Sequence, residues 1–188
     1  WNISNMEKFK HIQQQKENSC WVACAAMIIN CVCKTTYQDE DEFKKAHKIA
    51  KNTGDKQGNP MGLINQVLKK PKDFKCMVSD DHPLPTAQEI KDHFKDCGTP
   101  LLCCVGTDKP TKEDNYGKIM PNNEYSGGHW ILIIGIQEDN NNYNLIVADP
   151  ADGVPTPVLM DDITYQSDDN FTLYWENTSY VNFKPKKN

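Results

Sequence analysis

The segment from Gln13 to Ile29, QQQKENSCWVACAAMII, sets a polar, glutamine-rich stretch directly before a cysteine and a run of apolar residues. From Cys20 to about Asn30 the residues are apolar almost all the way round a helix, which is typical of a helix buried in the middle of a lobe. The thiol of Cys20 then stands at the N-terminus of this helix, where the positive end of the helix dipole stabilises a thiolate. The segment therefore predicts a central helix whose first residue is a candidate nucleophile.

Three further segments of the first half predict helices. Residues 38–52 read QDEDEFKKAHKIAKN and place acidic residues before lysines, which suits the helix dipole. Residues 58–70 carry a proline near the expected helix start, followed by apolar residues at helical spacing. Residues 85–98 contain Thr86 and Glu89 as a capping box and end at a glycine. The first half of the chain is therefore predicted to be helical.

From residue 100 onward, short β-rich runs alternate with turn residues, which predicts a sheet. The runs are PLLCCV (100–105), HWILIIGIQ (129–137), YNLIVADP (143–150), VPTPVLM (154–160) and FTLYW (171–175). The stretch from Gly106 to Gly128 is too long for a tight turn, and we expect it to be a surface loop that leads to His129. The prediction is a single α+β domain over residues 1–188, mainly helical in 1–99 and mainly antiparallel β in 100–188.

Composition and charge exclude several function classes. The net charge of −5 and the absence of arginine argue against a nucleic-acid partner, because no guanidinium is present to pair with phosphates or guanines. The longest apolar run, Trp21 to Ile29, is well short of the roughly 20 residues that span a bilayer, so no membrane partner is expected. The sequence begins at Trp1, and this start says nothing about an upstream leader or about export.

The eight cysteines do not suggest a disulfide framework, because such frameworks belong to small secreted chains that lack a core. Half of them lie within or beside apolar segments, where cysteine serves as a small buried hydrophobe: Cys24, Cys31, Cys103 and Cys104. We therefore expect mostly free thiols. The Cys31-x-Cys33 and Cys103-Cys104 spacings do not fit structural zinc sites, so no metal is expected. His93 and Cys97, one helical turn apart, are interpreted as ordinary helix surface.

Several short motifs occur together in a characteristic order between Gln13 and Pro150. They are Gln14 six residues before the cysteine of SCW, the strand GTPLLCCV, the strand GGHWILIIGI, and LIVADP about twenty residues later. In this order the chain resembles the papain-like cysteine peptidases, and within them the bacterial groups close to the bacteriocin-leader peptidases and the plant-pathogen effector proteases. The resemblance implies a papain-like α+β fold, with a helical lobe that carries the catalytic cysteine followed by an antiparallel β lobe.

The resemblance also implies a catalytic triad. Cys20 would be the nucleophile, and His129, between a glycine pair and a strand, would pair with it and later protonate the leaving amine. Asp149 ends the next strand, and adjacent antiparallel strands would bring it near His129, whose ring it would orient. Thiolate and imidazole suffice for this chemistry, so no cofactor is expected.

The same resemblance implies an oxyanion hole formed by the side-chain amide of Gln14 and the backbone N–H of Cys20. Gln13 and Gln15 are alternatives for the side-chain donor, although the six-residue spacing favours Gln14. Trp21 and Trp130 each follow a proposed catalytic residue and are interpreted as packing residues that shield the cleft. The remaining histidines stand in polar or amphipathic settings and are predicted to face solvent: His11, His47, His82 and His93.

Three function classes follow. The first is a cysteine endopeptidase that acts on a protein or peptide, either an effector or toxin exported from a bacterium or a module that processes its own precursor. The second is a glutamine deamidase or transglutaminase, because both also begin with thiolate attack on a carbonyl. The third is a non-catalytic binding domain on the same scaffold, against which the intact Cys20, His129 and Asp149 speak. The sequence leaves the oligomeric state open.

Overall fold

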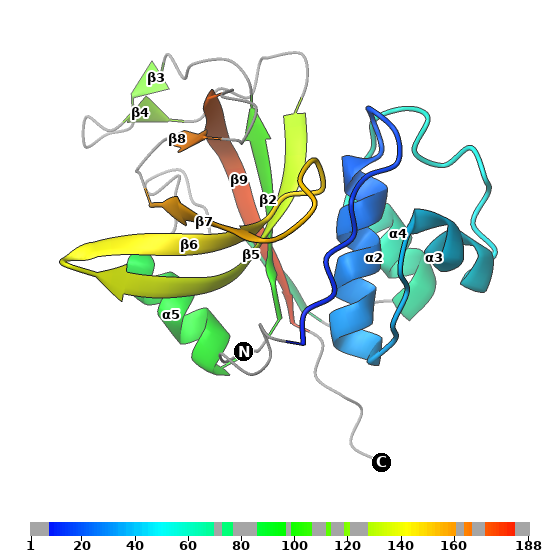
Figure 1. Cartoon of the computed structure of the whole chain (residues 1–188), viewed down its shortest axis with the longest axis horizontal. Helices are drawn as coiled ribbons and strands as arrows, with labels where there is room; N and C mark the ends of the chain where they lie inside the picture. Colours follow the sequence, from blue (N-terminus) through cyan, green and yellow to red (C-terminus); the bar gives the residue numbers. More distant parts are fainter. Residues whose placement is uncertain are drawn as a thin grey trace.

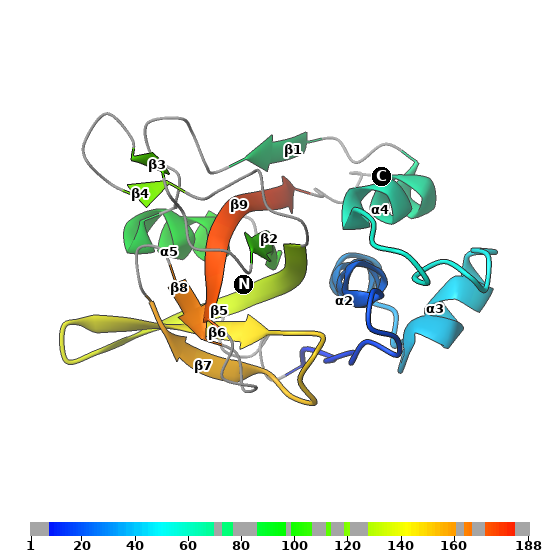
Figure 2. The ribbon, with the colours of Figure 1, turned by 90° about the horizontal axis from the view of Figure 1, so that it is seen from above.

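The computed structural model describes residues 8–69, 73–76, 86–96, 99–106, 112–113, 119–120, 128–160, 164–166 and 172–182. Helices lie on both sides of a central sheet (Figures 1 and 2). On one side are α2 (Cys20–Cys33), α3 (Glu40–Ala46) and α4 (Pro60–Leu68), and on the other is α5 (Ala87–Asp96). Seen from above in Figure 2, α2 lies between the sheet and α3.

The sheet has seven strands among the described residues, and every pairing in it is antiparallel. They are β1 (Asp73–Cys76), β2 (Leu101–Gly106), β5 (Gly128–Asp139), β6 (Asn142–Ala148), β7 (Thr156–Leu159), β8 (Thr164–Gln166) and β9 (Thr172–Asn182). The order is β1-β9-β2-β5-β6-β7, with β8 beside β9. The short strands β3 (Lys112–Glu113) and β4 (Ile119–Met120) pair separately within the predicted loop. The predicted α+β papain-like fold, with helices before an antiparallel sheet, is confirmed.

The predicted central helix exists and is longer than expected, because α2 continues past Asn30 to Cys33. It ends where Lys34 takes the left-handed conformation at φ 57°, a common helix stop. The capping box of α5 is also present, since the N–H of Glu89 donates to the Thr86 hydroxyl and the N–H of Thr86 donates to the Glu89 carboxylate. The sequence therefore marks the start of α5 correctly, whereas the end of α2 is set by the backbone conformation at Lys34.

The helix predicted over residues 38–52 is wrong at its C-terminal end, because α3 stops at Ala46. The chain then turns back toward the helix. In this returning segment the backbone carbonyls of Lys51 and Thr53 accept hydrogen bonds from the Lys44 ammonium, at 2.9 and 3.2 Å respectively. A buried lysine therefore fixes a turn where the amphipathic pattern alone would extend the helix.

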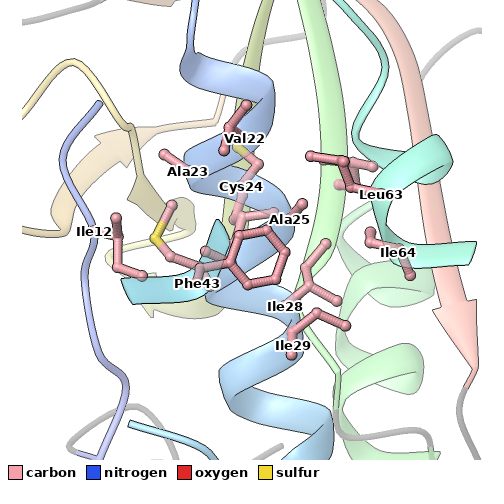
Figure 3. Packing of buried hydrophobic residues seen from close by; sticks show 14 of the residues in the cluster. Ile12, Val22, Ala23, Cys24, Ala25, Ile28, Ile29, Phe43, Leu63 and Ile64 are labelled. Atoms are coloured by element: carbon pink, nitrogen blue, oxygen red, sulfur yellow. The ribbon is translucent and has the colours of Figure 1, made fainter. Parts of the chain in front are cut away.

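The main core surrounds α2. Its apolar side chains pack against α3 and α4 on one side and against the sheet on the other, as Figure 3 shows for Phe43, Leu63 and Ile64. The sheet contributes the alternate residues Leu102, Leu132, Ile134 and Ala148 to this cluster. The prediction that α2 is buried in the middle of a lobe is therefore confirmed.

A second core lies on the opposite face of the sheet. There Ile90 and Phe94 of α5 pack against the other alternating set of strand residues, Leu101, Cys103, Ile131, Ile133, Leu145 and Val147. Strands β2, β5 and β6 are therefore apolar on both faces, which explains their continuous apolar runs. Because α5 and β1 precede residue 100, the first part of the chain contributes to the sheet layer as well as to the α2 layer.

Candidate active site

Three elements meet at the N-terminal end of α2. Figures 1 and 2 show the first turn of α2, the start of β5 and the loop between β6 and β7 close together, beside the segment that leads into α2. The three elements carry Cys20, His129 and Asp149 respectively, and the segment before α2 carries Gln14. The fold therefore brings together four residues that are far apart in the sequence.

His129 and Asp149 form a buried hydrogen-bonded pair. The Nε2 of His129 lies 2.6 Å from Oδ1 of Asp149, whose side chain is 1% exposed, whereas that of His129 is 19% exposed. Asp149 directly follows Ala148, which stands opposite Leu132 on β5. Asp149 therefore comes next to the start of β5, as the prediction from adjacent antiparallel strands required. The same Oδ1 also accepts the backbone N–H of Ala151 at 2.9 Å, which fixes the carboxylate.

The Cys20 thiol lies close enough to the His129 ring to raise the pKa of the imidazole. Because Nε2 is occupied by Asp149, Nδ1 is the ring nitrogen left to interact with the sulfur. Burial lowers the pKa of His129, but the hydrogen bonds with Asp149 and Cys20, together with the charges of both groups, raise it to about 10. The imidazole is therefore held as an imidazolium at neutral pH, and a neighbouring imidazolium stabilises a thiolate.

Cys20 is the first residue of α2 and is 5% exposed. Its N–H belongs to the first turn, whose N–H groups have no partner within the helix. Ser19 precedes the helix, but its side chain does not cap α2, and the first turn contains no acidic residue. The positive end of the helix dipole is therefore not neutralised locally and acts on the sulfur.

Gln14 lies beside the loop that carries Asp149, because its backbone N–H donates to the carbonyl of Pro150 at 2.7 Å. Its side-chain Nε2 donates to the carbonyls of Lys16 at 2.8 Å and Glu17 at 3.0 Å. Its Oε1 is buried and has no hydrogen-bond partner among the described residues. The amide thus faces the loop that leads to Cys20.

The neighbouring glutamines are engaged differently. The side chain of Gln13 is exposed and donates weakly, at 3.4 Å, to the carbonyl of Ala151. Gln15 is also exposed, and its backbone N–H donates to the Glu40 carboxylate at 2.6 Å. Of the three glutamines, Gln14 is therefore the one with a partly buried side chain in the loop before Cys20.

The prediction that the other histidines face solvent is wrong for His93, which is 5% exposed and whose Nε2 lies 2.6 Å from the carbonyl oxygen of Thr99. It is also wrong for His11 and His47, which are half-buried and hydrogen-bonded. His82 lies outside the described residues. His11 bonds the carbonyl of Asp152 at 2.6 Å and so ties the N-terminal segment to the loop after β6, a role that no local pattern signals.

Both tryptophans that follow proposed catalytic residues hold the loop before α4. The indole Nε1 of Trp21 donates to the carbonyl of Lys56 at 2.9 Å, and that of Trp130 donates to the carbonyl of Gly58 at 3.0 Å. Because Trp21 is on α2 and Trp130 is on β5, one loop connects the helical layer to the sheet beside the site. Packing is therefore the role that these contacts support.

We expect the substitution Gly58→Ala to destabilise the protein by about 1 to 3 kcal/mol, because overpacking a close contact forces neighbours to move. A Cβ at Gly58 would stand 2.7 Å from the Trp21 ring. Gly62→Ala is the matched control, since a Cβ there meets nothing within 4 Å and lies in a helix, where alanine stabilises by about 0.5 to 1 kcal/mol. Urea unfolding followed by tryptophan fluorescence measures both, and equal midpoints would contradict the expectation.

The other chemistry-bearing groups of the described residues do not form a metal site. In the described ranges, no cluster of three or more His, Cys, Asp or Glu side chains is placed to hold a metal ion. No helix among these residues is long and apolar enough to cross a membrane. Cys24, Cys31 and Cys33 are free thiols, as expected for most of the cysteines.

Comparison with known proteins adds a family. No curated protein is detectably similar to the chain in sequence. Residues 6–183 match the family described as the Peptidase_C39 like family, and this match spans the helices, the sheet and all four candidate residues. The chain therefore belongs to the Peptidase_C39 like family, a family of papain-like cysteine peptidases.

Proposed function

We propose that the protein hydrolyses peptide bonds as a cysteine peptidase, with Cys20 as nucleophile, His129 as acid and base, and Asp149 as the orienting group. The observation that carries this proposal is the hydrogen-bonded pair of His129 and Asp149 beside Cys20, whose thiol helps to raise the pKa of His129, at the N-terminus of α2. A nucleophile, a base in contact with it and a third group that fixes the base form the arrangement that covalent catalysis requires. Family membership supports the same chemistry.

The reaction follows from the positions of these groups. The Cys20 thiolate attacks the carbonyl carbon of the scissile bond, and the electron pair of the carbonyl moves to its oxygen. When this tetrahedral species collapses, the C–N bond breaks and His129 gives its proton to the leaving amine. The neutral imidazole then takes a proton from water, which attacks the thioester and releases the acid product together with the Cys20 thiolate.

Asp149 contributes orientation and charge. Its carboxylate accepts the Nε2–H of His129, which leaves Nδ1 directed at the sulfur. The carboxylate is itself held by the N–H of Ala151, so it cannot turn away without losing a second bond. Asp149 therefore fixes both the tautomer and the angle of the ring.

Gln14 is proposed as a donor to the oxyanion, together with the backbone N–H of Cys20. Its position in the loop before α2 and its tie to Pro150 support this assignment. Because Nε2 bonds the carbonyls of Lys16 and Glu17, one of its two N–H groups must turn or be shared when substrate binds. Stabilising charge that forms only in the transition state is the most valuable contribution such a donor makes.

The same triad could instead deamidate or cross-link glutamine side chains, and product mass separates these reactions. Peptide cleavage yields two fragments with the mass of one water added in total, whereas deamidation leaves the chain whole and about one dalton heavier. The likeness of the motifs to plant-pathogen effector proteases leads us to propose an exported effector, or a module that processes its own precursor, as the biological setting.

The direct test is selective labelling. Native protein treated with a limiting amount of iodoacetamide at several pH values should be alkylated at Cys20 in preference to the other cysteines, well below pH 8. His129→Ala should abolish that preference, because the imidazolium that stabilises the thiolate is removed. Peptide mass spectrometry locates the label. Alkylation spread over several cysteines, with the pH profile of an ordinary thiol, would refute the assignment of the nucleophile.

A further inference from the structure

A buried carboxylate that the proposed reaction does not use holds the loop between Gln14 and Cys20. Glu40, the first residue of α3, is 1% exposed. Its Oε2 accepts the backbone N–H of Gln15 at 2.6 Å and the hydroxyl of Ser19 at 2.9 Å. One oxygen therefore bonds the residue after Gln14 and the residue before Cys20.

The bond to Ser19 also leaves the N-terminus of α2 open. Serine directly before a helix commonly turns its hydroxyl onto the N–H groups of the first turn. Here the Ser19 hydroxyl lies 2.9 Å from Glu40 and 3.0 Å from both the N–H and the carbonyl of Lys16, and it makes no cap bond to α2. The dipole of α2 is therefore left for the Cys20 sulfur and for an oxyanion.

The surroundings of Glu40 are built to keep it in place. Lys44 follows one turn later on α3, is 5% exposed, and binds the carbonyls of Lys51 and Thr53. This holds the turn that contains Gly54, whose φ is +105°. A Cβ at Gly54 would come within 3.0 Å of the Ser19 Cβ and 3.7 Å of Glu40 Oε1, so the turn covers the Glu40–Ser19 contact closely.

We propose that Glu40 is a positioning residue that shapes the oxyanion hole by fixing the loop from Gln14 to Ser19. This inference rests on the proposed cysteine-peptidase function and goes beyond it, because Glu40 itself touches neither substrate nor sulfur in the mechanism. Replacing Glu40 should therefore slow the reaction steps that create an oxyanion and leave the rates of steps that need only the thiolate nearly unchanged. This difference separates a positioning role from a general structural role.

Two small reagents distinguish the two kinds of step. In alkylation by iodoacetamide, the thiolate displaces iodide at a saturated carbon, and no oxyanion forms. With 4-nitrophenyl acetate, the thiolate adds to a carbonyl, an oxyanion forms, and 4-nitrophenolate leaves with the bonding electron pair as the acetyl thioester is made. The ratio of the acetylation rate constant to the alkylation rate constant therefore reports on the oxyanion hole.

We expect Glu40→Ala to lower this ratio about 10- to 100-fold, the scale seen when a partner that orients a metal ligand is removed, because Glu40 orients the loop in the same indirect way. The alkylation rate constant should change by less than about threefold. Glu40→Gln should restore most of the ratio at neutral pH, because its amide oxygen can accept both hydrogen bonds. Glu42→Ala is the matched control, since Glu42 lies on the same helix and also accepts a backbone N–H, that of Gln38, but is exposed.

The pH dependence adds a second readout. Burial raises the pKa of Glu40, while the bonds from Gln15 and Ser19 and the nearby Lys44 oppose the shift and Asp41 adds to it. Lys16, paired with Asp55, also senses the charge of Glu40. The carboxylate is thus protonated at a higher pH than an exposed glutamate. Protonated Glu40 and glutamine are both neutral with one acceptor oxygen, so the ratio should fall on acidification by no more than the difference between the unmodified chain and Glu40→Gln at neutral pH. In Glu40→Gln this fall should disappear.

Several outcomes would overturn the proposal. The ratio could be the same in Glu40→Ala, Glu42→Ala and the unmodified chain, or both rate constants could fall in parallel. If Glu40→Ala fails to fold, Ser19→Ala carries the test and should lower the ratio several-fold, whereas an unchanged ratio would refute the proposal. Failure of the proposed function looks different, because the unmodified chain would then show no selective alkylation of Cys20 at all.

Discussion

Replacing Cys20 with alanine should abolish peptide hydrolysis, with a loss in kcat of about 10⁴-fold or more. Losses of this size or larger follow when the nucleophile of a catalytic triad is removed, because the partners of the nucleophile cannot act without it. Cys20 has the features required of that nucleophile, namely a helix N-terminus and a neighbouring imidazole, that of His129, whose pKa the thiol helps to raise. The measurement is turnover of the best peptide from a mass-spectrometric library screen.

Cys24→Ala is the matched control for this experiment. Cys24 lies one turn further along α2 and is fully buried. Burial raises the pKa of its thiol well above the usual value, so it stays a neutral thiol at working pH. Its replacement removes one buried sulfur and should leave turnover within a few-fold of that of the unmodified chain. Activity above about 1% in Cys20→Ala would instead show that another group is the nucleophile.

The sequence predicted those parts of the fold that local patterns encode strongly. The apolar run after Cys20 has no alternative to burial, so the central helix and its role in the core followed directly. The capping box at Thr86 and Glu89 fixed the start of α5. The order of helices and strands was also readable, because the hydrophobic period changes near residue 100.

Other parts depend on contacts that no local pattern reveals. Strand β1 is four residues long and exists because β9 pairs with it. The end of α3 depends on Lys44, whose ammonium satisfies carbonyls of a returning turn. In the sequence Glu40 is one of three acidic residues in the first turn of a helix, and nothing distinguishes it from the other two. Its burial against Ser19 depends on the folded chain.

The residues of the candidate site also fall into two groups, those whose positions the sequence predicts and one whose side-chain direction it does not. The positions of Cys20, His129 and Asp149 follow from elements whose ends the sequence marks, and the fold brings the three together. The side-chain direction of Gln14 does not follow, because it depends on loop carbonyls that become acceptors only once the loop has folded. Spacing can therefore nominate Gln14, whereas its behaviour with substrate needs an experiment.

Replacing Asp149 with alanine should lower kcat about 100-fold or more, because His129 loses the acceptor that fixes its tautomer and angle. Asp149→Asn should retain more activity, since the amide oxygen can still accept the Nε2–H of His129 and the N–H of Ala151. The two variants therefore separate orientation from charge. Asp139→Ala, at the exposed far end of β5, is the matched control and should leave kcat unchanged.

The charge of Asp149 should be visible in the alkaline limb of the pH profile. The pKa of His129 is raised to about 10 partly by the hydrogen bond and charge of Asp149, so the imidazolium persists through neutral pH and is lost only as the pH rises toward that value. In Asp149→Asn the charge is gone, the pKa of His129 falls, and the imidazolium is lost at a lower pH. The alkaline limb of kcat/KM should therefore shift to lower pH in this variant, because the leaving amine needs the imidazolium proton. An unshifted limb would mean that Asp149 acts on His129 through orientation alone and that its charge does not set the pKa of the imidazole.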